Sequence, residues 1–150
     1  MGSAVVQDVL ELAGVPYELV RCEATARTVV LIDGDLLRLV VIPVGDGLDL
    51  ERTRRALRAG PGLRAATTAE VAEDFPGFDP RALPPLGHEA VPELVCLGVL
   101  YLDDVVLDGG VKLDARDLLR LCEPRVADIC LNRRTGGRSP WSSGRRPPIA

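Results

Sequence analysis

The stretch TVVLIDGDLLRLVVIP, residues 28–43, decides how this chain folds. It contains two runs rich in β-branched and leucine side chains, separated by Asp33-Gly34-Asp35. Asp-Gly between two such runs is typical of a β-hairpin, because the tight turn needs a positive φ and glycine supplies it without steric cost. Both runs are almost continuously apolar, so we expect both strands to lie deep within a sheet.

Segments with helical periodicity flank this hairpin. The spacing of apolar residues predicts helices over residues 3–14, 49–60, 67–75 and 114–121. Asp49 and Asp114 can cap two of these helices through their carboxylates. Thr67 forms a capping box with Glu70 in a third, with Thr68 as the competing cap.

Shorter apolar runs predict further strands. One covers Tyr17–Arg21, and residues 93–113 predict two or three more around a turn at residues 108–110. Residues 123–131 read as a short closing segment. Because strands and helices do not alternate strictly, a doubly wound nucleotide-binding fold is disfavoured. We therefore predict a mixed α/β domain with a largely antiparallel or mixed sheet, over residues 1–131.

The charges are distributed unevenly along the chain. Its 150 residues carry 18 basic and 22 acidic side chains, a net charge of −4. Residues 132–150 hold five of the arginines and no acid, so residues 1–131 have 13 basic and 22 acidic side chains, a net charge of −9. Such an acidic body binds nucleic acid poorly, so any contact with a polyanion has to be local. The segment 132–150, rich in Gly, Pro and Ser, is predicted to be a disordered tail, with a basic binding patch as the alternative.

The composition also bears on the cellular compartment of the protein and on whether it can bind a metal. No apolar run approaches the roughly 20 residues of a membrane-spanning helix, and no basic segment opens the chain as in a secretory signal. The four cysteines show no Cys-x-x-Cys spacing and there is one histidine, which argues against a zinc site. We expect a cytoplasmic protein with reduced, buried thiols; a disulfide or a nucleophilic cysteine is the alternative.

A second stretch, FDPRALPPLGHE at residues 78–89, raises the question of function. Three prolines, one glycine and the chain's only histidine, His88, lie within it. Proline fixes φ and removes a donor, so the segment is neither helix nor central strand. A stiff loop can present backbone N–H and C=O groups to a ligand at low entropic cost, and Gly87 allows close approach. The simpler alternative is a connector stiffened by proline.

Familiar catalytic motifs are absent from the sequence. It contains no Walker A, G-x-G-x-x-G, G-x-S-x-G or H-E-x-x-H pattern. Asp103 and Asp104 are adjacent, so on a strand they point to opposite faces and form no carboxylate dyad. No cysteine lies near His88 in the sequence, which disfavours Cys-His catalysis.

The order of these motifs resembles the YbaK/ProX aminoacyl-tRNA deacylases, the family of editing domains associated with prolyl-tRNA synthetase. The similarity covers about residues 5–129. It rests on AGVPYELV after the first helix, the strand ARTVV with its hairpin partner, PPLG after the capped helix, and the closing LYLDDVVL and VKLDARDLLRL. The resemblance implies a YbaK/ProX-like fold, a curved, mixed and mostly antiparallel sheet flanked by helices.

The resemblance also implies an activity: hydrolysis of the ester of a mischarged tRNA that carries a small amino acid such as alanine or cysteine. In such proteins no side chain attacks; water does, helped by the terminal ribose, without metal or cofactor. The implied partner is the acceptor end of an aminoacyl-tRNA, and an aminoacyl-tRNA synthetase is a further candidate partner. No membrane is involved.

The resemblance assigns roles to individual residues. Arg27 stands where the family has a catalytic lysine, and backbone groups around Gly87 would polarise the ester carbonyl as an oxyanion hole does. The implied substrate-binding residues are Thr28, Ala82, Leu83, Pro84, Pro85, His88 and Asp103. Each has a plainer structural reading, as a surface strand residue, a turn or a satisfied loop side chain.

Two departures from the family pattern keep other functions open. Arginine at position 27 keeps the charge of lysine but is a planar fork, and Arg81-Ala82-Leu83 stands where the family carries a glycine. A degenerate relative that only binds tRNA ends, an aminoacyl group or a protein partner is therefore a second hypothesis. An interaction domain that works through its basic tail is a third.

Overall fold

The structure is a computed structural model and describes residues 2–131. The predicted basic tail, residues 132–150, lies outside the described residues. The helices are α1 (Gly2–Ala13), α2 (Leu50–Leu57), α3 (Thr68–Asp74), α4 (Leu97–Leu100) and α5 (Ala115–Cys122). The strands are β1 (Glu18–Leu19), β2 (Ala26–Asp33), β3 (Leu36–Pro43), β4 (Arg64–Ala65), β5 (Leu94–Cys96), β6 (Asp104–Leu107), β7 (Val111–Asp114) and β8 (Arg125–Ala127). The prediction of a mixed α/β fold is confirmed.

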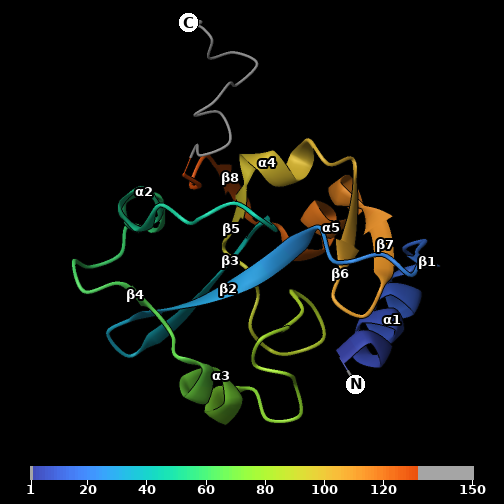
Figure 1. Ribbon diagram of the computed structural model, residues 1–150, viewed down its shortest axis with the longest axis horizontal. Coiled ribbons are helices and arrows are strands. Elements are labelled where there is room, and N and C mark those ends of the chain that lie inside the picture. Colours follow the sequence, from blue (N-terminus) through green and yellow to red (C-terminus); the bar gives the residue numbers. More distant parts are fainter. Residues whose placement is uncertain (1, 132–150) are drawn as a thin grey trace, which may run out of the picture.

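The strands form two sheets, where the sequence predicted one (Figure 1). The larger has the order β4-β2-β3-β5-β8, with parallel pairing of β5 to both β3 and β8. The smaller has the order β1-β7-β6 and is antiparallel. Thr25 joins the sheets, because its N–H donates to the carbonyl of Val106 at 2.8 Å and its Oγ1 accepts from the N–H of Val106 at 2.8 Å.

The hairpin that decides the fold is present as predicted. Every residue of β2 pairs with one of β3, from Ala26 opposite Pro43 to Asp33 opposite Leu36. Gly34 takes the positive φ, +62°, that the turn requires. Residues 39–43 of β3 are fully buried, so this strand lies in the middle of the larger sheet.

The helix-capping predictions are also confirmed. Asp49 and Asp114 accept from the backbone N–H groups of Arg52 and Arg116 at the starts of α2 and α5. At α3, Thr67 prevails over Thr68 as the cap, and its capping box with Glu70 is complete.

Several elements differ from the predictions, and the short strand β4 was not predicted. Residues 97–100 form α4 and not a strand, because an apolar run alone does not separate a strand from a short buried helix. Strand β1 covers only Glu18 and Leu19, which pair with Lys112 and Val111. Helix α2 ends at Leu57, and its C-cap Arg58 adopts a left-handed φ of 57°, two residues before the predicted stop at Gly60.

Two groups of buried side chains stabilise the fold. The larger fills the space between the two sheets and the helices α1, α2 and α5. The smaller contains Val30 and Leu39 of the hairpin, Val71 of α3, Phe75 and Leu83. We call residues 75–93, which connect α3 to β5 without regular secondary structure, the proline loop. Leu83 anchors this loop on the hairpin. No helix within residues 2–131 is long and apolar enough to span a membrane.

Candidate functional site

The proline loop is fixed to the rest of the fold at both ends. At its start, the N–H of Phe75 donates to the carbonyl of Val71 in α3 at 2.9 Å, and the Phe75 side chain is buried against Val71 and the hairpin. At its end, the N–H of Glu93 donates to Leu39 at 2.8 Å, and Arg38 holds both carboxylate oxygens of Glu93 at 2.7 and 2.9 Å. Irregular connections longer than about 15 residues are uncommon and are usually functional.

The middle of the loop has unused backbone donors. None of the N–H groups of residues 86–91 donates a hydrogen bond to any residue that the structure describes. Pro84, Pro85 and Pro92, on either side of this run, have no N–H at all. Leu86, Gly87, His88 and Ala90 are buried or half-buried, whereas Glu89 and Val91 are exposed. Backbone N–H groups in buried or half-buried positions normally find a partner, so those of the first four residues are available to a ligand with acceptor atoms.

Gly87 gives the loop its shape at this point. Its φ is +96°, and a Cβ there would lie 2.7 Å from Cγ1 of Val5 in α1. Glycine is therefore required both by the backbone conformation and by the close approach to α1. The absence of a side chain at Gly87 therefore lets the backbone of the loop lie against α1 at this residue.

A cavity of about 420 Å³ opens beside these donors. Besides residues 85–91, it is lined by Val9 of α1 and by Leu121 and Cys122 of α5. Its volume lies within the range of about 300–1,000 Å³ that is usual for small-molecule sites, and it combines apolar walls with a few polar groups as such sites do.

His88 adds a hydrogen-bond acceptor to the cavity lining. Its Nε2 lies 2.7 Å from the carbonyl of Pro84, and because a carbonyl can only accept, Nε2 carries the hydrogen. In the neutral ring Nδ1 then bears a lone pair, and this atom is buried without a partner in the described chain. The edges of Phe75 and Phe78, with ring centroids at 5.0 and 5.6 Å, hold the imidazole in place.

The cavity lining contains two further ionisable side chains, Glu89 and Cys122, which differ in exposure. Glu89 is exposed and has no hydrogen bond or ion pair with residues 2–131. Burial raises the pKa of the Cys122 thiol to about 11, so it is neutral near pH 7 and is no nucleophile. No three His, Cys, Asp or Glu side chains in the described part of the chain lie close enough together to hold a metal ion.

The candidates on β2 lie outside this cavity lining. Arg27 is exposed, makes no hydrogen bond or ion pair with the described residues, and shares its face of the hairpin with Ile42. Thr28 points to the opposite face, together with Val30, on which Leu83 packs. The Oγ1 of Thr28 is buried and has no partner within residues 2–131. Arg27 and the loop's anchor Leu83 therefore lie on opposite faces of β2.

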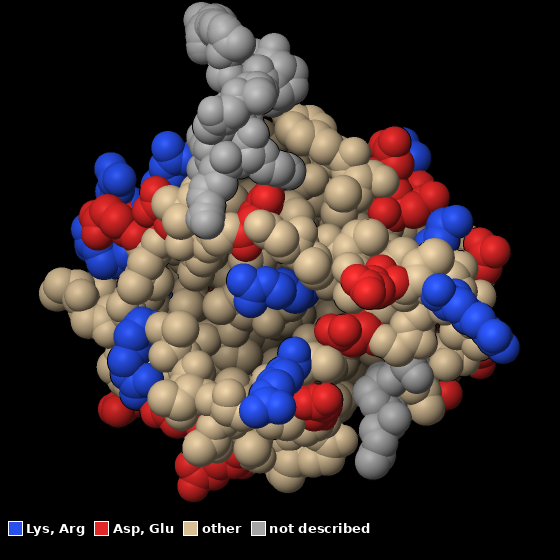
Figure 2. Space-filling model, viewed as in Figure 1, with Lys and Arg blue, Asp and Glu red and all other residues tan. Residues whose placement is uncertain are grey.

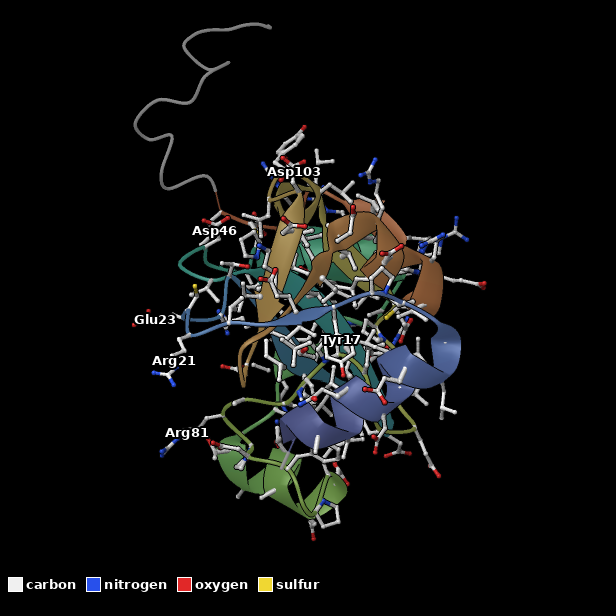
Figure 3. The ribbon with its side chains drawn as sticks, turned by 90° about the vertical axis from the view of Figure 1, so that its right-hand side faces the viewer. Tyr17, Arg21, Glu23, Asp46, Arg81 and Asp103 are labelled. Atoms are coloured by element: carbon white, nitrogen blue, oxygen red, sulfur yellow. The ribbon has the colours of Figure 1, made fainter. Side chains whose placement is uncertain are left out.

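Of the residues singled out from the sequence, Pro85, Gly87 and His88 meet in the cavity. Ala82, Leu83 and Pro84 precede it along the loop. Asp103, at φ 63°, lies between α4 and β6, and Figure 3 shows it at the far end of the molecule from Arg81 of the proline loop. Val9, Leu121 and Cys122 were not anticipated, because α1 and α5 are distant in sequence and local patterns give no sign of their meeting.

Basic side chains gather near the middle of the face shown in Figure 2, among acidic ones. Figure 3 shows Arg21 and Arg81 projecting from one side of the molecule, Arg21 before β2 and Arg81 from the proline loop. Neither guanidinium has an ion pair with a described residue. These charges are available to a polyanion although the body as a whole is acidic.

Comparison with known proteins supports the fold. No family model matches the chain, and no curated protein matches its sequence. Among solved structures, a candidate trans-editing enzyme for prolyl-tRNA synthetase is similar over 87% of this chain and 98% of its own, with a TM-score of 0.72 and 23% identity. A hypothetical protein matches 85% of this chain and 99% of its own, with a TM-score of 0.71 and 18% identity.

A third match covers only part of a longer chain. A candidate signal transduction protein from Marinobacter aquaeolei VT8 is similar over 91% of this chain but only 32% of its own, with a TM-score of 0.67 and 24% identity. At such identities the likeness shows a shared fold. The chain therefore has the mixed α/β fold of the candidate trans-editing enzyme.

Proposed function

We propose that this protein is a trans-acting deacylase that hydrolyses the ester of a mischarged aminoacyl-tRNA carrying a small amino acid such as alanine or cysteine. The observation that carries the proposal is the run of residues 86–91, which lines a cavity of about 420 Å³ and whose N–H groups donate to no residue among 2–131. The fold shared with a candidate trans-editing enzyme supports the same activity.

In the proposed reaction the loop acts on the ester carbonyl. Backbone N–H groups beside Gly87 hydrogen-bond the carbonyl oxygen and stabilise the negative charge that develops on it. The oxygen of a water molecule forms a bond to the carbonyl carbon, the bond to the ribose oxygen breaks, and that oxygen leaves with a proton. The second ribose hydroxyl of the terminal nucleotide assists the water, so no side chain of this chain needs to attack.

Arg27 has a separate role in this proposal. Its guanidinium is exposed, has no ion pair within residues 2–131, and lies on the face of β2 away from Leu83. Contact with the phosphate of the terminal nucleotide suits that position better than contact with the ester, since guanidinium groups bind phosphate in a bidentate manner. Thr28, whose buried Oγ1 lacks a partner among the described residues, is the neighbouring candidate for a hydrogen bond to substrate.

A deacylation assay tests the proposal. Purified protein is expected to release amino acid from alanyl-tRNA or cysteinyl-tRNA, and Arg27→Ala is expected to slow release about 10- to 100-fold, the usual effect of losing a hydrogen bond to a charged group. Arg55→Ala is the matched control, because this arginine is 66% exposed on α2. If no amino acid is released above background from alanyl-, cysteinyl- or seryl-tRNA, the proposed deacylase activity is refuted.

A second candidate function is binding without hydrolysis. The resemblance implies a lysine close to the ester at position 27. This chain has Arg27 there, outside the cavity lining, and this favours binding without hydrolysis. A protein that binds aminoacyl-tRNA and protects its ester, with no release over hours, would show this function. The same assay therefore separates the two candidates.

A further inference from the structure

Two of the four cysteines meet in the core, although they lie far apart in the sequence. Cys96 is the last residue of β5, and Cys130 follows β8, which pairs in parallel with β5 and places Ala127 beside Cys96. Both are free thiols in the same hydrophobic cluster, 2% and 4% exposed, and their side chains are hydrogen-bonded to each other. The fold therefore forms a pair of neighbouring thiols that no local spacing in the sequence indicates.

Cys130 lies at the edge of the core, in a segment held to the turn after β3. The N–H of Asp49 donates to the carbonyl of Ile129 at 2.7 Å, and the N–H of Leu131 donates to the carbonyl of Gly47 at 2.8 Å. Leu131, the next residue after Cys130, is 41% exposed. Local opening of such a short segment costs less than global unfolding, so a molecule little larger than water can reach the two thiols from this side.

The two thiols differ in acidity. The hydrogen bond from Cys130, with the backbone N–H groups of Gly98 and Ile129, lowers the pKa of Cys96 in spite of its burial. The hydrogen bond to Cys96, together with burial, raises the pKa of Cys130. Cys96 therefore loses its proton first, while Cys130 keeps its own. A thiolate reacts with peroxides, and a neighbouring thiol can convert the product to a disulfide.

We propose that Cys96 and Cys130 are a reversible oxidation site, which forms a disulfide with hydrogen peroxide as the oxidant. The Cys96 sulfur attacks one peroxide oxygen and the O–O bond breaks, giving a sulfenic acid and a hydroxide ion that takes up the proton lost by Cys96. The Cys130 sulfur then attacks the Cys96 sulfur, the S–S bond forms, and the S–OH bond breaks as the oxygen leaves with the Cys130 proton. Two thiols and one hydrogen peroxide thus yield one disulfide and two water molecules.

This site is independent of the proposed deacylase, because neither cysteine lines the cavity beside the proline loop. The remaining two cysteines serve as internal references. Cys122 lines that cavity, and burial raises its pKa to about 11, so it is expected to stay reduced. Cys22 is exposed, contrary to the expectation that the thiols are buried, and it reports how strongly the oxidant acts on an accessible thiol.

Peptide mapping tests the proposal on the folded, full-length chain. The chain is treated with hydrogen peroxide, the remaining thiols are blocked with N-ethylmaleimide in denaturant, and the protein is digested with trypsin. Cleavage after Arg and Lys places Cys96 in the fragment 82–112 and Cys130 in the fragment 126–133. Mass spectrometry is expected to find these two fragments joined with the loss of two hydrogen atoms, and dithiothreitol is expected to separate them again.

Three serine variants distinguish the roles of the cysteines. Cys96→Ser is expected to abolish the link. Cys130→Ser is expected to stop the reaction at the sulfenic acid, which dimedone traps on fragment 82–112. Cys22→Ser, the same change at the exposed cysteine, is expected to leave the link unchanged. A parallel treatment in urea, where the fold no longer holds the thiols together, is expected to give less of this link and a mixture of other pairs.

Oxidation confined to Cys22, or a Cys96–Cys130 link that forms only in urea, would overturn the proposal. Dimedone labelling of Cys130 in Cys96→Ser, without labelling of Cys96 in Cys130→Ser, would overturn the assignment of Cys96 as the thiol that reacts with peroxide. If a serine variant fails to fold, the linked fragments of the wild-type chain still decide whether the site exists. The deacylation assay has no bearing on either outcome.

Discussion

Gly87 is the residue on which the geometry of the candidate site depends most directly. At φ +96° any other residue is strained, and a Cβ would lie 2.7 Å from Cγ1 of Val5. Gly77, in the same loop at φ +94°, has no atom within 4 Å of its ideal Cβ. Substitution of Gly77 should therefore report backbone strain alone, whereas substitution of Gly87 should report strain together with a steric conflict with α1.

We expect Gly77→Ala to lower the free energy of unfolding by about 1–3 kcal/mol, from strain alone. Gly87→Ala should lower it further, because Val5 or the loop also has to move. In the double variant Val5→Ala/Gly87→Ala, part of the loss should be recovered. Urea unfolding of the four proteins measures this, and equal losses for Gly77→Ala and Gly87→Ala would show that the contact with Val5 is unimportant.

The sequence indicated some of the site residues and could not indicate others. The pattern Pro-Pro-Leu-Gly-His identified Gly87 and His88, because proline and glycine constrain the local backbone. The lone pair on His88 Nδ1 depends on the carbonyl of Pro84, and Val9 and Leu121 reach the cavity only through tertiary packing. Such contacts have no local signature.

At the scale of elements, predictions succeeded where a local hydrogen bond or turn dictates the structure. The Asp-Gly turn fixed the hairpin, and side-chain caps fixed the starts of α2, α3 and α5. The predictions failed where tertiary packing determines the secondary structure. The run at residues 97–100 is helical, and Gly98 lies close to Pro43 of the hairpin, with an ideal Cβ 3.1 Å from the ring.

The start of α3, which leads into the proline loop, gives a prediction for pH. The Arg64 guanidinium, with help from the backbone N–H of Thr67, lowers the pKa of Glu70 from about 4.5 to about 2. Because the folded pKa is below the unfolded one, the stabilisation is complete above about pH 4.5 and is lost as the pH falls towards 2.

We therefore expect Glu70→Gln to flatten the fall in unfolding free energy between pH 4.5 and 2, relative to wild type. Arg64→Ala should flatten it in part, because the hydrogen bond from Thr67 remains. Urea titrations at several pH values measure both effects. A wild-type slope in Glu70→Gln over this window would contradict the role of Glu70.

At the scale of the whole molecule, the proline loop lies where distant parts of the chain meet. Leu83 packs on the hairpin, Gly87 lies against α1, and the carbonyl of Glu93 accepts from the N–H of Arg125 in β8 at 3.0 Å. The contact between Glu93 and Arg125 arises because β5 pairs in parallel with both β3 and β8. The cavity therefore exists only in the complete fold, and no segment read alone could predict it.

The charge distribution of the chain gives a prediction for the tail. Residues 1–131 have a net charge of −9, and residues 132–150 carry five arginines without an acid. If the tail contacts tRNA, each arginine that binds a phosphate adds about one unit to the slope of log K against log salt. The cavity residues all lie within residues 9–122, so the chemistry should not need the tail.

Deletion of residues 132–150 is therefore expected to leave the maximal rate of deacylation near wild type, while weakening tRNA binding at low salt and reducing its salt dependence. Saturating alanyl-tRNA tests the rate, and binding measured between low and moderate salt tests the slope. We expect the tail to act on affinity because its five arginines are not offset by any acidic residue in that segment. Binding abolished at every salt concentration would instead indicate that the tail itself is the interaction module and that the folded body only carries it.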